Sequence, residues 1–463
     1  MNRRTGSNES LSRYESSGVR YESRPDPVSA AGRVYASIER DFRTAGVQAR
    51  WISVVDPWGV PYYRSRWLPT TFTDIDEQET QLRRLIQRAR RTGAAVLSWY
   101  PLSLNKAAVQ VHPDWAQQML VDMANPGVHR GIECCIHSGY GAALIEFACE
   151  AIERFGLDGF WFDGSAWTQI WERPVPLSCV CRHCRELYRR QTGHDLPTQV
   201  DWADDGFRRW VGWRYEAFGG YIGRLTQQIH RRHPHASVVI NHYHRPQIPW
   251  QSAVPIDLYD APIVTGSEAT GDAGVDLVMR LCRAYQRPHC EVWTPLTIGP
   301  DPKQDAETTE LIHHAAACIT AGGFPSYGGA YSSSAADVLA RISPWVNPLV
   351  RYVGGASLSH VAIHVSQQSE TYFYSRHPKG VNWETEPYWL TINGWTQALN
   401  AMHMPPDYLF DACLIESEMA RYRVLILPAS PALSDAQCAA LYRYVQQGGR
   451  VVLGPGAGCC DEW

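Results

Sequence analysis

The stretch LDGFWFDG at residues 157–164 decides the fold of this 463-residue chain. Its centre, Gly159–Phe162, is a wholly apolar run, which predicts a strand that is buried on both faces. Strands of this kind belong to parallel sheets whose crossover helices cover the sheet. Asp163 then ends the strand, and Gly164 lets the backbone turn. The stretch therefore predicts an α/β fold with a carboxylate at the carboxyl end of a strand.

Similar apolar runs alternate with helical patterns on both sides of this stretch. The runs that predict strands are Ala49–Val55, Ala94–Trp99, Ser237–Asn241, Ile256–Tyr259, His289–Trp293 and Phe324–Tyr327, and the weak segment Val19–Glu22 is an eighth candidate. Alternation of strands and helices is typical of βα units. We expect a (β/α)8 TIM-type barrel over residues 23–355, after a disordered tail over residues 1–22. An open doubly wound sheet is the alternative, but no Gly-rich phosphate turn supports it.

The pattern changes after residue 355. Apolar strands are predicted at Val361–Val365, Tyr422–Leu427 and Arg450–Leu453, with helices at Trp389–Ala401 and Ala436–Gln447. This arrangement favours a small flavodoxin-like α/β domain over residues 356–463. It has fewer strands than such a domain usually needs, so we expect the domain to be incomplete and the chain to be a fragment.

Charge and composition argue against several classes of protein. Lys and Arg number 43 and Asp and Glu number 47, which gives a net charge of −4 and no basic excess for nucleic acid or a membrane surface. No apolar run approaches the ~20 residues that span a bilayer. No apolar segment follows the basic N-terminus as in a signal peptide, so we expect a cytoplasmic protein with reduced thiols. The 18 Trp and 23 Tyr slightly favour sugar binding over ordinary core packing.

Asp163 is the first candidate for catalysis, because the carboxyl ends of barrel strands carry the active site. An ordinary Asp-Gly turn is the alternative. Glycoside hydrolysis requires a second carboxyl group, about 5–5.5 Å away in retaining enzymes and about 6.5–9.5 Å away in inverting ones. Glu268 and Glu291 are the candidates: Glu268 lies in the loop after the predicted strand Ile256–Tyr259, and Glu291 lies within or at the end of the predicted strand His289–Trp293.

Polar and aromatic residues are expected to bind the substrate around these carboxylates. They can donate hydrogen bonds to sugar hydroxyls or stack on a sugar ring. The candidates are Asp56, Trp58, Trp99, Tyr100, His137, Trp161, Asn241, His242, His244 and Trp293. Loop packing is the alternative for each one taken alone.

A cysteine-rich segment, CVCRHC, occupies residues 179–184. Cys179, Cys181 and Cys184 could bind zinc with Cys135 as a fourth ligand. Zinc sites usually show two paired ligand clusters, and here there is one, so we expect buried inert thiols, with structural zinc as the alternative. We expect no cofactor.

Several motifs resemble known families. The sequence WFDG at residues 161–164 resembles the nucleophile strand of the α-L-fucosidases of glycoside hydrolase family 29. The whole chain after about residue 20 is more similar to the group called hypothetical glycosyl hydrolase 6, which overlaps family 151. Its motifs are matched at residues 112–115, 135–140, 179–184 and 192–197, with the aromatic Tyr188. The C-terminal region resembles the β-galactosidase trimerisation domain.

The resemblance implies a barrel and a retaining double displacement. Asp163 would be the nucleophile, and a Glu, preferably Glu268, would be the acid and base. It also implies a carbohydrate substrate and a homo-oligomer, either a dimer or a trimer. The family's His-containing motif is absent at residues 54–63, where Asp56 and Pro57 stand instead. The identity of the sugar therefore stays open, as does the alternative of a non-catalytic carbohydrate-binding subunit.

Overall fold

The structure is a computed structural model. It describes residues 49–120, 132–163, 177–241, 264–266, 277, 280–281, 284, 292–297, 306–320, 324–328, 333–352, 356–374 and 387–462. The expected tail and the expected strands at 19–22 and 256–259 lie outside these residues.

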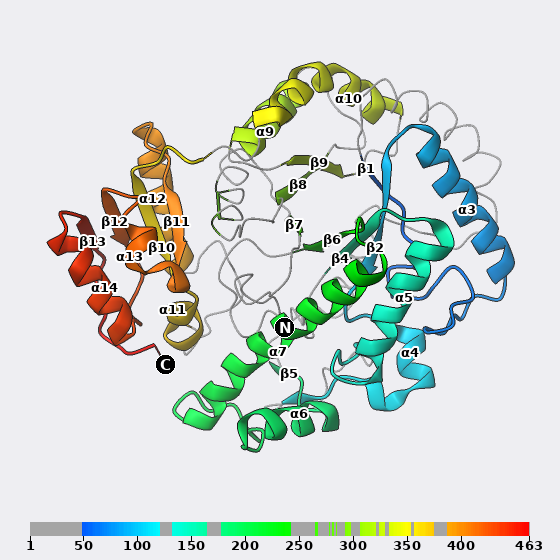
Figure 1. Ribbon diagram of the computed structural model, residues 1–463, viewed down its shortest axis with the longest axis horizontal. Coiled ribbons are helices and arrows are strands. Elements are labelled where there is room, and N and C mark those ends of the chain that lie inside the picture. The colour runs from blue at the N-terminus through cyan, green and yellow to red at the C-terminus, as the bar shows by residue number, and fades with distance from the viewer. Residues whose placement is uncertain are drawn as a thin grey trace, which may run out of the picture.

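A parallel sheet forms the first part of the molecule. Its strands are β1 (Ala49–Trp51), β2 (Ala95–Pro101), β4 (Gly159–Asp163), β6 (Ser237–Asn241), β7 (Val264–Gly266), β8 (Val292–Thr297) and β9 (Phe324–Gly328). They pair in this order, and every pairing is parallel. In Figure 1 these strands curve into a ring with helices outside. The described part of the chain thus confirms the (β/α)8-type barrel, with seven of its strands in place.

Helices cover the outside of the ring. They are α3 (Ile75–Arg91), α4 (Lys106–Val111), α5 (Gly139–Phe155), α6 (Arg182–Thr192), α7 (Asp205–Arg232), α9 (Ala306–Thr320) and α10 (Ser333–Val346), with 3-10 turns η1 (Pro113–Trp115) and η3 (Asn347–Tyr352). A two-stranded antiparallel pair, β3 (Met119–Leu120) with β5 (Leu177–Ser178), lies outside the main sheet.

Local sequence explains where the helices begin and end. The Ser138 hydroxyl accepts a hydrogen bond from the Tyr140 amide at the start of α5, and the Asp204 carboxylate accepts one from the Phe207 amide at the start of α7. Helix α5 ends at Gly156, whose φ of 62° is the left-handed conformation that glycine adopts without strain. On α3, the predicted apolar face buries Leu82, Ile86 and Ala89.

Strand β4 is buried on both faces, as its apolar sequence predicts. Phe160 and Phe162 are fully buried in the large apolar cluster shared with the helices. Trp161 points to the other face, where it packs with Leu97 of β2 and Val239 of β6. This second, smaller cluster fills the barrel interior.

Two barrel strands differ from the sequence prediction. β7 (Val264–Gly266) pairs with β6 and β8, although its sequence VTG has the appearance of a loop. β8 begins at Val292, so the strand predicted at 289–293 starts and ends later than expected. β7 has only three residues, which is too few for a periodic pattern to reveal.

The second part of the molecule is a four-stranded parallel sheet. Its strands β10 (Val361–Val365), β11 (Asp407–Phe410), β12 (Val424–Leu427) and β13 (Arg450–Leu453) have the order β11-β10-β12-β13. The helices are α11 (Gln367–Tyr372), α12 (Pro387–Ala401), α13 (Glu416–Met419) and α14 (Asp435–Gln446), with the turn η5 (Asp411–Cys413). This order matches the start of the flavodoxin-like order, which confirms the predicted class. The short strand β11 was not predicted.

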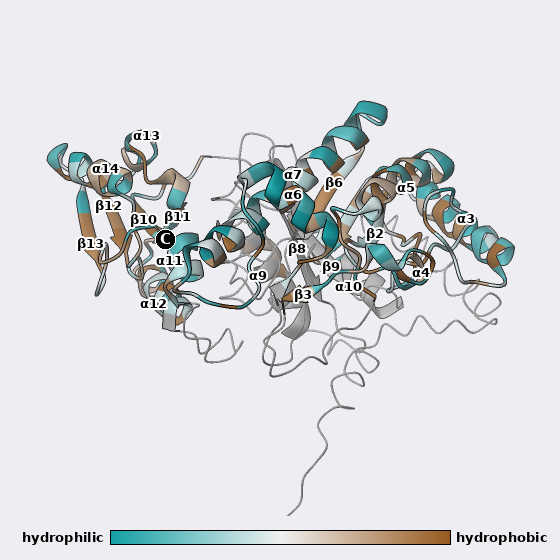
Figure 2. Ribbon diagram, turned by 90° about the horizontal axis from the view of Figure 1, so that it is seen from below, coloured by the Kyte–Doolittle hydropathy of each residue, from teal (hydrophilic) through white to brown (hydrophobic). Residues whose placement is uncertain are grey.

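Hydropathy follows the layers of both parts. In Figure 2, strands β12 and β13 are largely brown, while α14 beside them carries both teal and brown residues. Of the helices that the structure describes, none combines the length and hydropathy of a membrane span.

Candidate functional site

Asp163 lies at the carboxyl end of β4, on the same face of the strand as Trp161. Its side chain is half-buried, and its backbone pairs with Pro101 at the end of β2. Since Trp161 faces the barrel interior, the alternation of a strand directs Asp163 to the interior as well. This is the position in which barrel enzymes carry catalytic groups.

Trp99 of β2 holds this carboxylate. Its indole Nε1 donates a hydrogen bond of 2.8 Å to Oδ2 of Asp163. A hydrogen bond to a charged oxygen is stronger than one between neutral groups, and it fixes the rotation of the carboxylate. Trp161 is only 7% exposed and packs below this pair in the barrel interior. The structure therefore brings together three predicted residues, Asp163, Trp99 and Trp161.

Asp56 and Trp58 lie in the loop between β1 and α3. Oδ1 of Asp56 accepts hydrogen bonds of 2.8 Å from the amides of Trp58 and Val60, so this carboxylate orders its own loop. Burial raises the pKa of Asp56. Trp58 is 42% exposed at the tip of the loop, where its ring is available for stacking.

A close contact fixes that loop against the segment after β2. Gly59 has a φ of 74°, and a Cβ there would lie 2.0 Å from the carbonyl oxygen of Leu104. The Asn105 side chain donates a hydrogen bond of 2.7 Å to the carbonyl of Gly59. Only glycine fits this position, because both the conformation and the space exclude a side chain.

Tyr100 and His137 are not brought to Asp163. Tyr100 is fully buried on the helix-facing side of β2, where its hydroxyl lies 3.1 Å from that of Tyr140. His137 lies beside Trp213, with ring centroids 6.0 Å apart. Burial and the charge of Arg224 lower the pKa of His137 to about 4.

The other predicted residues are only partly placed. Glu268, Glu291, His242 and His244 lie outside the described residues. Asn241 and Trp293 are placed by their backbones: each pairs with Gly266, Asn241 at the end of β6 and Trp293 within β8. In chain order, Glu268 comes two residues after β7 ends and Glu291 directly precedes β8.

Four cysteines form a candidate metal centre. The Sγ atoms of Cys135, Cys179, Cys181 and Cys184 all lie within 4.8 Å of one another, and all four residues are buried. Cys181 caps α6, while Cys179 follows β5 and Cys135 precedes α5. Zn–S bonds of about 2.3 Å in a tetrahedron require S–S separations of roughly 3.8 Å. The Cys135 and Cys184 sulfurs are 3.5 Å apart, so the donor set fits zinc in number, chemistry and spacing.

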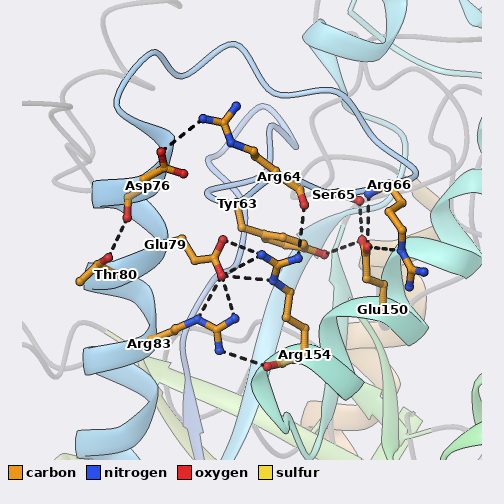
Figure 3. Close-up of polar contacts among 10 residues, drawn as sticks. All are labelled: Tyr63, Arg64, Ser65, Arg66, Asp76, Glu79, Thr80, Arg83, Glu150 and Arg154. Atoms are coloured by element: carbon orange, nitrogen blue, oxygen red, sulfur yellow. Dashed lines mark hydrogen bonds and ion pairs between the residues drawn. The ribbon is translucent and has the colours of Figure 1, made fainter.

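An anchoring network around Glu150 was not predicted from the sequence. Glu150 of α5 is buried, and it accepts hydrogen bonds from Ser65 Oγ (2.6 Å), Arg66 Nε (3.0 Å) and the Tyr63 hydroxyl (3.3 Å). Figure 3 shows these three side chains converging on it from the β1–α3 loop. The same loop carries Asp56 and Trp58, so Glu150 fixes the loop to the barrel wall.

A second ion-pair group joins α3 to α5 beside this network. Arg154 lies 2.8 Å from Glu79, and Arg83 contacts the same carboxylate at 2.7 Å (Figure 3). These two arginines lower the pKa of Glu79 against the opposing effect of its burial. In a sequence such charges look like an exposed helix face, which is why they gave no signal.

A Ser-His-Asp arrangement occurs in the C-terminal sheet. Nδ1 of His364 lies 2.7 Å from Ser430 Oγ, and its Nε2 lies 3.2 Å from Asp411 Oδ1. Ser430 is completely buried, so its hydroxyl cannot reach a substrate. His364 lies within β10 near its carboxyl end, and Asp411 and Ser430 follow β11 and β12, so their hydrogen bonds join the carboxyl ends of these strands.

Comparisons with known proteins agree with this architecture. Residues 36–164 match the family model described as hypothetical glycosyl hydrolase 6, and residues 359–463 match the β-galactosidase trimerisation domain. A comparison with curated proteins gives no match.

Solved structures share the fold at low sequence identity. A catalytic mutant of Gan42B, a GH42 β-galactosidase from G. stearothermophilus, aligns with a TM-score of 0.69 and 15% identity over 93% of this chain and 70% of its own. A β-galactosidase from the haloarchaeon Halorubrum lacusprofundi aligns with a TM-score of 0.66 and 14% identity over 94% of this chain and 72% of its own. The α-L-fucosidase isoenzyme 2 from Paenibacillus thiaminolyticus aligns with a TM-score of 0.60 and 17% identity over 90% of this chain and 60% of its own. At these identities the likeness shows a shared fold.

Proposed function

We propose that this chain is a retaining glycoside hydrolase with Asp163 as its nucleophile. The observation that carries the proposal is the Asp163 carboxylate at the carboxyl end of β4, on the interior face of the barrel and bonded to Trp99 at 2.8 Å. The match of residues 36–164 to a glycosyl hydrolase model supports the same reaction class.

The proposed reaction has two displacements. Asp163 attacks the anomeric carbon, and an ester bond forms as the bond to the leaving oxygen breaks. A glutamic acid gives its proton to that oxygen, and then removes a proton from the water that cleaves the ester. The indole of Trp99 holds Oδ2 in place, which preorganises the carboxylate for attack.

We assign the acid and base to Glu268 in preference to Glu291. Glu268 follows the carboxyl end of β7, whereas Glu291 precedes the amino end of β8. Catalytic residues of barrels come from the carboxyl ends of strands. Azide should restore turnover of an activated aryl glycoside by Glu268→Ala but not by Glu291→Ala.

We propose an α-L-fucoside as the substrate, with a β-D-galactoside as the competing candidate. The WFDG motif and a fucosidase among the structures of similar fold support the first sugar. The trimerisation-domain match and the β-galactosidases of similar fold support the second. The match to the trimerisation domain also favours a homo-oligomer. An oligomer would give a light-scattering mass above the 52.2 kDa of one chain.

The test is turnover of both aryl glycosides by the wild-type protein and by Asp163→Asn. We expect the substitution to lower kcat by roughly 10³-fold or more, because it removes the nucleophile but keeps its shape. Asp158→Asn is the matched control: Asp158 precedes the amino end of the same strand and accepts a hydrogen bond from the Val96 amide. It should retain activity.

Unchanged turnover in Asp163→Asn would remove Asp163 from the reaction. No turnover of any glycoside by the wild-type protein, together with saturable sugar binding, would identify the alternative of a non-catalytic binding subunit.

We further propose that Cys135, Cys179, Cys181 and Cys184 hold a zinc ion. Four protein ligands complete a tetrahedral site and leave no position for a substrate, so the ion would be structural. It would tie β5, the start of α6 and the segment before α5 together. No catalytic step passes through it.

A further inference from the structure

Two adjacent cysteines follow the last strand of the C-terminal sheet. Cys459 and Cys460 lie in the loop after β13, and neither belongs to the proposed active site or to the four-cysteine site. Their Sγ atoms are 3.7 Å apart, so both sulfurs lie on the same side of the loop. Cys459 is exposed and Cys460 is half-buried, and neither forms a disulfide with another described cysteine. The loop therefore presents two thiols side by side at the surface.

The backbone of this loop is fixed on both sides of Cys459. Gly456 and Gly458 have φ values of 73° and 69°, which are left-handed conformations that favour glycine. The Gly458 amide donates a hydrogen bond of 3.0 Å to the carbonyl of Ser430, and the Cys460 amide donates one of 3.0 Å to the carbonyl of Pro431. The thiol pair is therefore preorganised, and a ligand that binds both sulfurs has little loop to order.

The separation of the two sulfurs suits one atom that bonds to both. Two bonds of about 2.3 Å, the length of a zinc–thiolate bond, would meet across this gap of 3.7 Å at an angle close to tetrahedral. Zinc itself takes four ligands in a structural site. Among the residues that the structure describes, only the four-cysteine site gathers three or more donors, so zinc would find two ligands at Cys459 and Cys460. The pair suits a soft atom that needs only two sulfurs.

We propose that Cys459 and Cys460 form a dithiol site for trivalent arsenicals that carry one organic substituent. Arsenic(III) is a soft, three-coordinate centre, and thiolates select soft centres. Its own substituent fills one position and the two cysteine sulfurs fill the others. On binding, the arsenic–oxygen bond of the arsine oxide breaks and two arsenic–sulfur bonds form. Both thiol protons leave with the oxygen as water, and nothing is oxidised or reduced. The site is independent of the hydrolase and zinc proposals.

The test treats the full chain, kept reduced by a phosphine, with phenylarsine oxide. We expect an adduct that excess monothiol does not remove but that 2,3-dimercaptopropanol does, because two tethered sulfurs hold the arsenic at a high effective concentration. Trypsin cleaves after Arg450, and the peptide 451–463 that it releases contains only these two cysteines. Mass spectrometry should locate the arsenic on this peptide.

Single substitutions separate chelation by the pair from attachment to one thiol. Cys459→Ser and Cys460→Ser should each weaken retention of the arsenical by about 100-fold or more, since each variant leaves one sulfur. Cys438→Ser is the matched control and should retain the arsenical like the wild type, because Cys438 is an exposed cysteine on α14 of the same sheet domain. If Cys460→Ser does not fold, Cys459→Ser at the exposed position decides alone.

Three outcomes would overturn the site. The first is wild-type retention of the arsenical by Cys459→Ser. The second is an adduct on the wild-type chain that monothiol removes completely, which indicates attachment to single thiols. The third is arsenic on the peptides of the four-cysteine site and none on the peptide 451–463. None of these results bears on glycoside turnover, which the Asp163 variant tests separately.

Discussion

The hydrogen bond between Trp99 and Asp163 sets the geometry of the proposed nucleophile. We expect Trp99→Phe to lower kcat by roughly 10–100-fold, because the ring volume is kept while the carboxylate loses its positioning donor. KM should change much less. Steady-state kinetics on the aryl glycoside checks this, with Trp67→Phe, an exposed tryptophan of the β1–α3 loop, as the control. A changed KM at constant kcat would instead make Trp99 a contact to the sugar.

The sequence predicts single residues well where chain position alone determines their place. Asp163 follows an apolar run, so its location at a strand end was predictable. The side of the strand was harder: Tyr100 was expected at the site with Trp99, but neighbouring residues of a strand face opposite ways, and Tyr100 joins the helix layer. Glu150 gave no signal, because its partners Tyr63, Ser65 and Arg66 are distant in sequence and a charged residue in a helix usually faces solvent.

At the scale of elements, Glu150 links helix α5 to the β1–α3 loop. We expect Glu150→Gln to reduce the free energy of unfolding by about 1–3 kcal/mol, since a buried carboxylate that accepts several hydrogen bonds becomes a neutral amide with fewer acceptor sites. Arg66 is mostly exposed, so the ion pair itself contributes little. Urea denaturation measures the change, and hydrogen exchange over residues 52–74 should report a looser loop. Glu153→Gln, at an exposed position of the same helix, should change neither quantity.

Most helices and strands were predictable because each is long enough to show the repeat of apolar residues that is typical of its type. The helices α3, α5 and α7 repeat buried residues over several turns, and β2, β4, β10 and β12 are mainly apolar runs. The strands β7 and β11 have three and four residues, and only their pairing with neighbours defines them. The sequence named the three clustered cysteines and Cys135 as a candidate set, and the fold brings their four sulfurs within 4.8 Å of one another.

For the whole molecule, the barrel and the C-terminal sheet share one apolar cluster. It includes Phe218 of α7, Tyr372 of α11 and Tyr388 of α12. The Tyr215 hydroxyl of α7 also lies 3.5 Å from Thr371 Oγ1. A continuous core of this kind couples the two parts, so neither should unfold without disturbing the other.

This coupling predicts the effect of truncating a shared core residue. Tyr372→Ala should lower the free energy of unfolding by about 3 kcal/mol through the lost burial and the cavity left behind. The substitution should lower the unfolding midpoints of the barrel and of the C-terminal sheet together in denaturant. Hydrogen exchange of β4 reports on the barrel, and hydrogen exchange of β10 reports on the C-terminal sheet. Tyr442→Ala removes a side chain of the same type that is 66% exposed on α14, and it should change stability by less than about 0.5 kcal/mol. Two separate transitions, with only β10 affected by Tyr372→Ala, would show instead that the shared cluster is a contact between independently folding units.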